Sequence, residues 1–345
     1  MLGSTILKLS DPYEYQIAVG RAGNFKTIVT EPGIYQSELA FVDLHHIGLQ
    51  QGRISLARIV QGATEKNLCM FAFLAADNQA HITFNGTEPP QSHIVFCCPG
   101  DEYVTSTSAE CCWSGITLPP ETLASASQVL AGYEIIAPKA SQVIRTPPPL
   151  MGRLLNLHRL ASQLAATAPG VLTHSEIARA IEQELLRALI ACLANPAKAK
   201  KPNPNRQRVM QRFHQLIEAK QYEPLYLPEL CATVGVPERS LYGICKDYFG
   251  LSPQRYLWLR RMNLVRRALA LADPNKRANS VTGIASDYGF TEFGRFSVQY
   301  RAMYGESPSA TLRKSRVLPR SSPRADCCRL PSDRAAPARP EALTK

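Results

Sequence analysis

The chain has 345 residues, enough for two domains, and a globular composition with 45% apolar and 19% charged residues. It lacks a run of about 18 apolar residues and a secretory signal pattern, so we expect a cytoplasmic protein without a membrane span and with mostly reduced cysteines. The net charge of +11 is uneven, since residues 198–316 hold 21 Lys and Arg against 9 Asp and Glu, whereas residues 1–197 hold 12 against 16. This balance favours a polyanionic partner for the basic segment, although a solvated basic surface would give the same balance.

Residues 1–149 are predicted to form a β-rich domain. Between about Ile17 and Leu118, short alternating or β-rich segments are separated by Gly, Pro, Asn and Asp, a pattern typical of a small β-sandwich or barrel. The predicted strands are 54–60, 69–75, 80–86, 92–98 and 111–118.

Two helices are predicted in the segment 150–194. The first covers Leu150–Ala168 and the second runs from about Thr173 to Leu193, each with an apolar stripe at helical spacing. Such stripes usually pack into a core. Because the pair follows a small β-domain, dimerisation through these helices is the alternative that we keep open.

A linker and a tail flank the basic segment. Residues 195–205 (NPAKAKKPNPN) are predicted to be a linker, because Pro stops helices and Lys favours solvent. Residues 317–345 are rich in Pro, Arg, Ala and Ser, have no periodic pattern and are predicted to be disordered.

The segment 206–316 contains an internal repeat. Residues from Leu227 to Pro253 recur in register from Val281 to Pro308, each as a short apolar helix, a Gly turn and a second helix of about a dozen residues. This is the layout of a helix-turn-helix, whose second helix enters the major groove of DNA. A long helix over 254–272 joins the two copies.

Four arginines lie in the joining helix and cannot all face one way. We expect some of them to pack across the domain or to pair with Asp247 or Asp287. They are Arg260, Arg261, Arg266 and Arg267.

The second copy of the repeat carries a longer motif, from Ile284 to Arg313. Its residues are Ile284, Ala285, Gly289 and Phe290, then Phe293, Phe296 and Tyr300, then Gly305, Ser307, Pro308 and Arg313. With this motif, about a third of the chain (205–315) resembles the DNA-binding domain of AraC/XylS-type transcriptional regulators. The N-terminal part is similar to the family's ligand-sensing β-domains only in size, order and type of element.

The resemblance implies an α+β protein. A β-sandwich or barrel sensor domain with dimerisation helices would precede an all-α domain with two helix-turn-helix motifs. It further implies a sequence-specific transcriptional regulator, an activator rather than an enzyme, that binds promoter DNA. RNA polymerase, a second copy of the chain and an unidentified small-molecule effector are the other expected partners, and no cofactor is expected.

Candidate DNA-contacting residues lie on the outer faces of the two second helices. Helical spacing predicts that Leu241, Ile244, Cys245, Tyr248 and Phe249 face the core in the first copy, and that Phe296, Tyr300, Met303 and Tyr304 do so in the second. The family pattern then assigns to DNA the residues Arg239, Ser240, Tyr242, Gly243, Lys246, Phe293, Gly294, Arg295 and Val298. Arg295 could form a bidentate contact with guanine or clamp a phosphate, and Lys246 should reach a phosphate. Gly243 stands where the family often has a long polar side chain, so we expect few direct base contacts from the second helix of the first copy.

Two other kinds of site were weighed for the N-terminal part. A metal site of the cupin type fails on spacing, because His45 and His46 are adjacent and His81 and His93 are isolated. A thiol- or metal-responsive regulator remains the alternative function. It would use the vicinal pairs on strands expected to be neighbours, Cys97, Cys98, Cys111 and Cys112, although buried structural thiols are the common case.

An effector pocket is expected inside the β-domain. Four aromatic residues are candidates to line it, although core packing is the usual role of such side chains. They are Trp113, Tyr103, Phe96 and Phe84.

Overall fold

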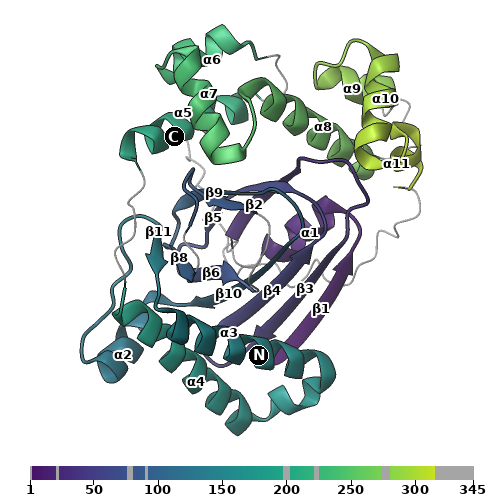
Figure 1. The fold of residues 1–345 in the computed structure, drawn as a ribbon. Helices are drawn as coiled ribbons and strands as arrows, with labels where there is room; N and C mark the ends of the chain where they lie inside the picture. The colour runs from purple at the N-terminus through teal and green to yellow at the C-terminus, as the bar shows by residue number, and fades with distance from the viewer. Residues whose placement is uncertain are drawn as a thin grey trace, which may run out of the picture.

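The computed structural model describes residues 2–20, 23–75, 81–89, 92–196, 203–220, 225–272 and 280–314. Two β-sheets form the N-terminal part, and helices form the described C-terminal part from residue 203 onwards (Figure 1). This is the α+β architecture that the sequence predicts. The predicted tail 317–345 and residues 197–202 of the predicted linker lie outside the described residues.

The larger sheet has seven strands, and all its neighbours pair antiparallel in the order β1-β3-β4-β10-β6-β8-β11. Its strands are β1 (Gly3–Leu9), β3 (Ser37–Asp43), β4 (Gly48–Ile54), β6 (Cys69–Leu74), β8 (His93–Cys97), β10 (Cys111–Leu118) and β11 (Gln142–Arg145). Both of its faces are covered, which explains why β8 is a continuous buried run rather than an alternating one.

The smaller sheet has four antiparallel strands in the order β2-β5-β9-β7. They are β2 (Gly23–Val29), β5 (Arg58–Thr64), β7 (Ile82–Phe84) and β9 (Glu102–Thr107). Buried side chains of this sheet, such as Phe25 and Tyr103, share one core with Met70 and Val95 of the larger sheet. The two sheets therefore form a sandwich, with a closely packed interior and a cavity within it.

The predicted strand over 54–60 is wrong. Strand β4 ends at Ile54 in the larger sheet and β5 begins at Arg58 in the smaller one, so the chain crosses between sheets at residues 55–57. Two hydrogen bonds from backbone N–H groups hold the crossing. Ser55 N–H donates to the backbone carbonyl of Gln36, and Ala57 N–H donates to the side-chain carboxylate of Glu31. Helices α1 (Pro12–Val19) and α2 (Pro120–Ala131) were not predicted, although Asp11 before Pro12 is a start signal.

Helices α3 (Pro148–Thr167) and α4 (Ser175–Ala194), joined by a short 3₁₀ turn (Pro169–Thr173), cover the outer face of the larger sheet (Figure 1). Their apolar stripes pack against that sheet, with Leu154, Ala161, Leu185 and Leu189 all buried in its second core. The stripes thus serve the core, so a dimer through the two helices would have to use their outer faces.

The C-terminal part contains seven helices among its described residues. They are α5 (Pro204–Ala219), α6 (Leu227–Val234), α7 (Glu238–Phe249), α8 (Pro253–Leu271), α9 (Val281–Asp287), α10 (Phe293–Tyr304) and α11 (Pro308–Lys314). Helix α8 joins the pair α6–α7 to the pair α9–α10 (Figure 1). Its buried face, with Tyr256, Leu259, Met262 and Val265, supplies the core that both pairs share.

The helical part docks on the outer face of the smaller sheet. The amide of Asn263 in α8 pairs with both backbone groups of Val29, accepting from its N–H at 3.4 Å and donating to its carbonyl at 3.3 Å. Asp11 accepts from Arg266 at 3.0 Å, and Lys26 pairs with Glu218. The interface is thus polar as well as apolar, which is typical of a contact between domains.

Candidate nucleic-acid interface

The second helix of each repeat has one buried and one exposed face. In α7 the five residues predicted to face the core are all buried, and so are the four predicted in α10. In the first copy the stacked rings of Phe249 and Tyr256, 4.1 Å apart between centroids, tie α7 to α8. In the second, Phe296 packs on Phe290 at 4.8 Å. Each outer face is therefore held by a rigid core, as a recognition helix requires.

Matching glycines shape the two copies. Gly235 and Gly289 have φ of 79° and 77°, and each follows the first helix of its pair. Gly250 and Gly305, at 70° and 72°, end the second helices. Because this left-handed region suits glycine, the repeat in sequence is also a repeat in backbone geometry.

The residues proposed for DNA in the first copy lie together on one face of α7. Arg239, Ser240, Tyr242 and Lys246 are exposed and Gly243 is half-buried. Two of the side chains already have partners, since the Tyr242 hydroxyl donates to Gln254 at 2.6 Å and Lys246 Nζ donates to the Gly250 carbonyl at 3.0 Å. Arg239 is the remaining long side chain on this face that can donate hydrogen bonds. Among the described residues the structure gives its side chain no partner, so it is available for DNA.

The residues proposed for DNA in the second copy are all exposed. The side chain of Arg295 is 72% exposed and lies 3.8 Å from Glu292, one turn away, which is a weak surface pair that DNA could displace. Phe293 and Val298 are large apolar side chains left in solvent, at 37% and 71% exposure. An arginine with apolar neighbours on one helix face can contact guanine and thymine methyl groups in a major groove.

Four arginines of α8 pack across the molecule, which is one of the two alternatives expected from the sequence, and among the described residues none of them pairs with Asp247 or Asp287. Asp247 pairs with Arg206 instead, while Arg260 pairs with Glu218 at 3.0 Å. Arg266 reaches Asp11 of the N-terminal part, and Arg267 lies over the ring of Tyr13. Arg266 and Arg267 thus serve the packing between the two parts of the molecule, whereas Arg260 and Arg261, which lies over the ring of Phe290, serve the packing within the helical part.

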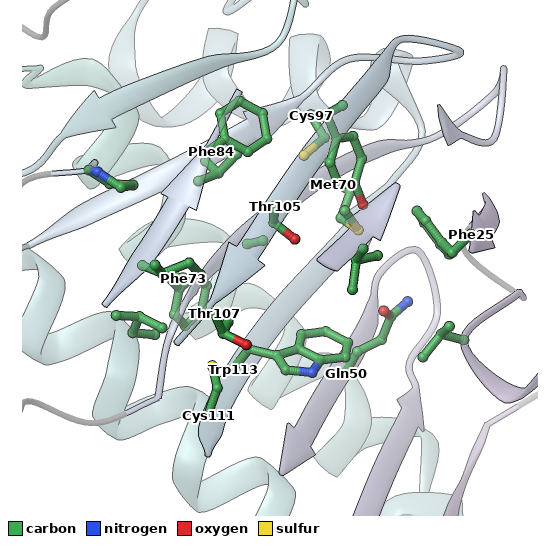
Figure 2. A pocket seen from close by; sticks show the side chains of 18 of the residues that line it. Phe25, Gln50, Met70, Phe73, Phe84, Cys97, Thr105, Thr107, Cys111 and Trp113 are labelled. Atoms are coloured by element: carbon green, nitrogen blue, oxygen red, sulfur yellow. The ribbon is translucent and has the colours of Figure 1, made fainter. Parts of the chain in front are cut away.

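The N-terminal cavity is lined by three of the four aromatic candidates. Trp113 and Phe84 border it (Figure 2), and so does Tyr103. Phe96 instead lies in the core on the other side of the larger sheet, where it packs with Phe71. Sequence reasoning missed Arg58, which also lines the cavity. The one signal for it was a charged residue within the strongly apolar run 54–60.

The vicinal cysteines do not lie on neighbouring strands, because β6 separates β8 from β10. Burial raises the pKa of Cys97, Cys98, Cys111 and Cys112, to about 12 for Cys98. Protonated thiols are poor nucleophiles and poor metal ligands. Within the described residues there is also no group of three or more His, Cys, Asp or Glu side chains that could hold a metal ion, so this geometry gives the thiol or metal alternative no support.

Comparison with known proteins assigns the helical part to a family. Residues 230–314 match the family described as a helix-turn-helix domain. The XylDLEGF operon transcriptional activator 1 of Pseudomonas putida is 37% identical over 117 residues, which cover 34% of this chain and 34% of that protein. A probable thc operon regulatory protein of Rhodococcus erythropolis is 30% identical over 142 residues, 41% of this chain and 42% of that one.

The chain thus spans about a third of the length of the first relative and less than half of the length of the second.

Among solved structures, the alignment with the AraC-like transcriptional activator CuxR covers 76% of this chain and 95% of the CuxR chain. The identity is 13% and the TM-score is 0.40, so the likeness is too slight to support an argument. No helix in the described ranges is both long and apolar enough to cross a membrane. The matched domain, the twin helix-turn-helix geometry and the named relatives agree, and the C-terminal part of this chain is a helix-turn-helix domain of the AraC/XylS type.

Proposed function

We propose that the protein is a sequence-specific DNA-binding transcriptional regulator, and not an enzyme, that contacts promoter DNA through α7 and α10. The observation that carries this proposal is the pairing of two recognition helices whose inner faces are buried and whose outer faces are exposed. The excess of Lys and Arg over residues 198–316 supports it, because basic residues supply most of the affinity for a phosphate backbone.

The finer parts of the proposal concern regulation. The relatives named as operon activators support the proposal that this protein activates transcription. As an activator it would contact RNA polymerase, and it would act on the chromosome in the cytoplasm. The cavity of the β-sandwich supports a small-molecule effector, which would shift a pre-existing equilibrium between DNA-competent and DNA-incompetent arrangements. A homodimer would place two such DNA-binding domains on repeated half-sites. The two copies would have to meet through surfaces other than the buried stripes of α3 and α4.

Arg295→Ala tests the reading of bases by α10. Sites are first selected from a random DNA pool with the wild-type protein, and affinity is then measured by fluorescence anisotropy on the selected site and on random DNA. We expect a loss of about 1–3 kcal/mol on the selected site and little on random DNA, because a guanine contact is sequence-specific.

Two control variants complete this test. Arg301→Ala removes an equal charge from the exposed C-terminal end of the same helix and should weaken binding to both DNAs alike. Arg295→Lys keeps the charge but loses the planar fork, so it should behave like Arg295→Ala on the selected site. Equal losses on the two DNAs for Arg295→Ala would identify a phosphate clamp, and failure to select any site would refute the proposed function.

A further inference from the structure

A cavity of about 110 Å³ lies between the two sheets (Figure 2). Its wall is mainly apolar, with Met70, Val95 and Phe84 from the sheets and Val19 from α1. An engineered apolar cavity of about 150 Å³ is large enough to bind benzene. The cavity here is smaller than that one, so it suits a short alkyl chain or at most a single ring and is too small for a sugar phosphate or a nucleotide.

One charged side chain lines this apolar cavity. Arg58, the first residue of β5, is 5% exposed, and its Nε and Nη1 atoms have no hydrogen-bond partner. No carboxylate among the described residues forms an ion pair with it. Trp113, on the opposite sheet, adds a second buried donor to the wall, its Nε1–H, which lies beside the Tyr15 hydroxyl.

The charge of Arg58 acts inside the cavity wall. Burial raises the pKa of Tyr15 and of Cys111, and the positive charge of Arg58 opposes that rise in both residues. The guanidinium thus lies beside Tyr15 of α1 and Cys111 of β10, which both border the cavity.

A buried guanidinium with no carboxylate beside it is costly, because the charge has lost water and gained no opposite charge in return. The Tyr15 hydroxyl and the Cys111 thiol hydrogen-bond to the Arg58 side chain, but both are neutral groups and leave its charge unbalanced. An anion entering the cavity would supply the missing opposite charge. The planar fork of arginine fits a carboxylate through two parallel N–H···O bonds. A phosphate dianion would need more donors than this wall offers, and a neutral ligand would leave the charge unpaired.

We propose that the cavity binds a small monocarboxylate whose carboxylate pairs with Arg58 and whose apolar body lies between Met70, Val95 and Phe84. The biological role of this site rests on the proposed function, because the bound acid would be the effector of the proposed regulator. The Nε1–H of Trp113 is a second donor for the bound acid.

The test compares acids with their neutral amides. Butanoate and hexanoate, and the amide of each, are titrated into the purified full chain by calorimetry and by thermal melting. We expect at least one acid to bind and to raise Tm, and its amide to bind at least about tenfold more weakly, because only the acid forms the charge-assisted pair. Equal affinity for acid and amide, or no binding of either acid, would overturn the proposal.

Arg58→Met and Met70→Leu are the matched variants. Methionine fills a similar volume without a charge, so Arg58→Met should abolish the response to the acid while the melting temperature of the ligand-free protein stays equal or rises. Met70→Leu alters the apolar wall alone and should keep the preference of acid over amide. A fall in the melting temperature of ligand-free Arg58→Met by several degrees would mean that contacts within the protein, such as those with Tyr15 and Cys111, already compensate the buried charge, and would refute the argument.

DNA binding separates this inference from the proposed function. Ligand-free Arg58→Met should bind the DNA site selected by the wild-type protein. If wild type binds selected DNA but not the acids, only the carboxylate site is refuted. If the acid binds as expected and no DNA site can be selected, the carboxylate site stands and the regulator is refuted.

Discussion

Among single residues, Gly243 in the middle of α7 departs most from what a helix prefers. A Cβ built at this position meets no other atom within 4 Å, so the side chain of alanine has room. Gly243→Ala should raise the free energy of unfolding by about 0.5–1 kcal/mol, because glycine loses more backbone entropy on folding. Urea unfolding measures this change, and Gly294→Ala, next to the N-terminus of α10, is the control with a smaller expected gain.

The same variant tests how closely α7 approaches the bases. If α7 makes few contacts with base edges, as the missing side chain at Gly243 suggests, Gly243→Ala should change the Kd for the selected DNA site by no more than about twofold. Such a change is far smaller than the tenfold change in Kd that corresponds to about 1.4 kcal/mol. A tenfold loss of affinity would mean that DNA lies against the bare backbone at Gly243.

Another residue, His158 in α3, should make stability depend on pH. Burial lowers its pKa to about 4, while the hydrogen bond between its Nε2 and the Gly115 carbonyl opposes that shift. In the unfolded chain the pKa is about 6.5, so below that pH the unfolded state binds a proton that the folded state refuses. Stability contributed by His158 is thus complete above about pH 6.5 and is lost as pH falls towards 4.

Urea unfolding of the full chain between about pH 7 and pH 5 measures this dependence. His158→Gln keeps a donor for the Gly115 carbonyl and removes the titration, so the curve against pH should be flatter. His214 is another buried imidazole, with a pKa lowered to about 3 by burial, and it remains in the variant as one source of the residual slope. An unchanged slope in His158→Gln would contradict the prediction.

Among elements, helix α1 is held at its start by a residue with two roles. Asp11 Oδ1 accepts from the backbone N–H of Tyr13 at 2.7 Å, while Oδ2 accepts from Arg266 of α8 at 3.0 Å. Asp11→Asn keeps the cap and loses the ion pair, whereas Asp11→Ala loses both. We expect the Asn variant to destabilise the docked state by about 1–3 kcal/mol, as when one partner of a charged hydrogen bond is removed, and the Ala variant by about 1 kcal/mol more.

Hydrogen exchange locates this effect. Amides of β2 and α8 should exchange faster in Asp11→Asn, because the two elements meet in the docked contact. The buried strand β8 lies in the other sheet and should keep its protection. Equal protection in all three elements would show that Glu306, 3.8 Å from Arg266, holds the arginine in place of Asp11.

The sequence predicted those elements whose signals are local. The turn glycines follow from the repeat and have the left-handed backbone that such turns need. The inward residues of α7 and α10 and most of the stripes of α3 and α4 follow from spacing, and the structure buries them as expected. The crossing at residues 55–57 could not be predicted, because a β-rich run is the same whether its strand stays in one sheet or changes sheets. The order of strands that separates Cys97 from Cys111 likewise depends on distant pairings.

At the scale of the whole molecule, the smaller sheet is a platform for the helical part. Its contacts join residues far apart in the chain, such as Val29 of β2 and Asn263 of α8 at a separation of 234 residues, so no local sequence pattern could predict them. Tyr248 of α7 adds to the contact, since its carbonyl accepts from Thr83 Oγ1 at 3.2 Å. The recognition residues of α7 are meanwhile exposed, so docking fixes the orientation of this helix without covering its outer face.

Helix α1 connects the cavity to this platform. Tyr15 and Val19 border the cavity, and eight residues of helix, about 12 Å long, end at the Asp11 cap that holds Arg266. Any movement of α1 that lets an acid alter DNA affinity must work equally in reverse, because coupling between two bound ligands is reciprocal. Promoter DNA is then an effector of the cavity. Hexanoate titrated into the DNA-saturated protein should show its Kd changed by the same factor that hexanoate imposes on the Kd for DNA. A promoter would in this way tune the concentration of acid to which its own regulator responds, so that one cell could read one metabolite at several thresholds.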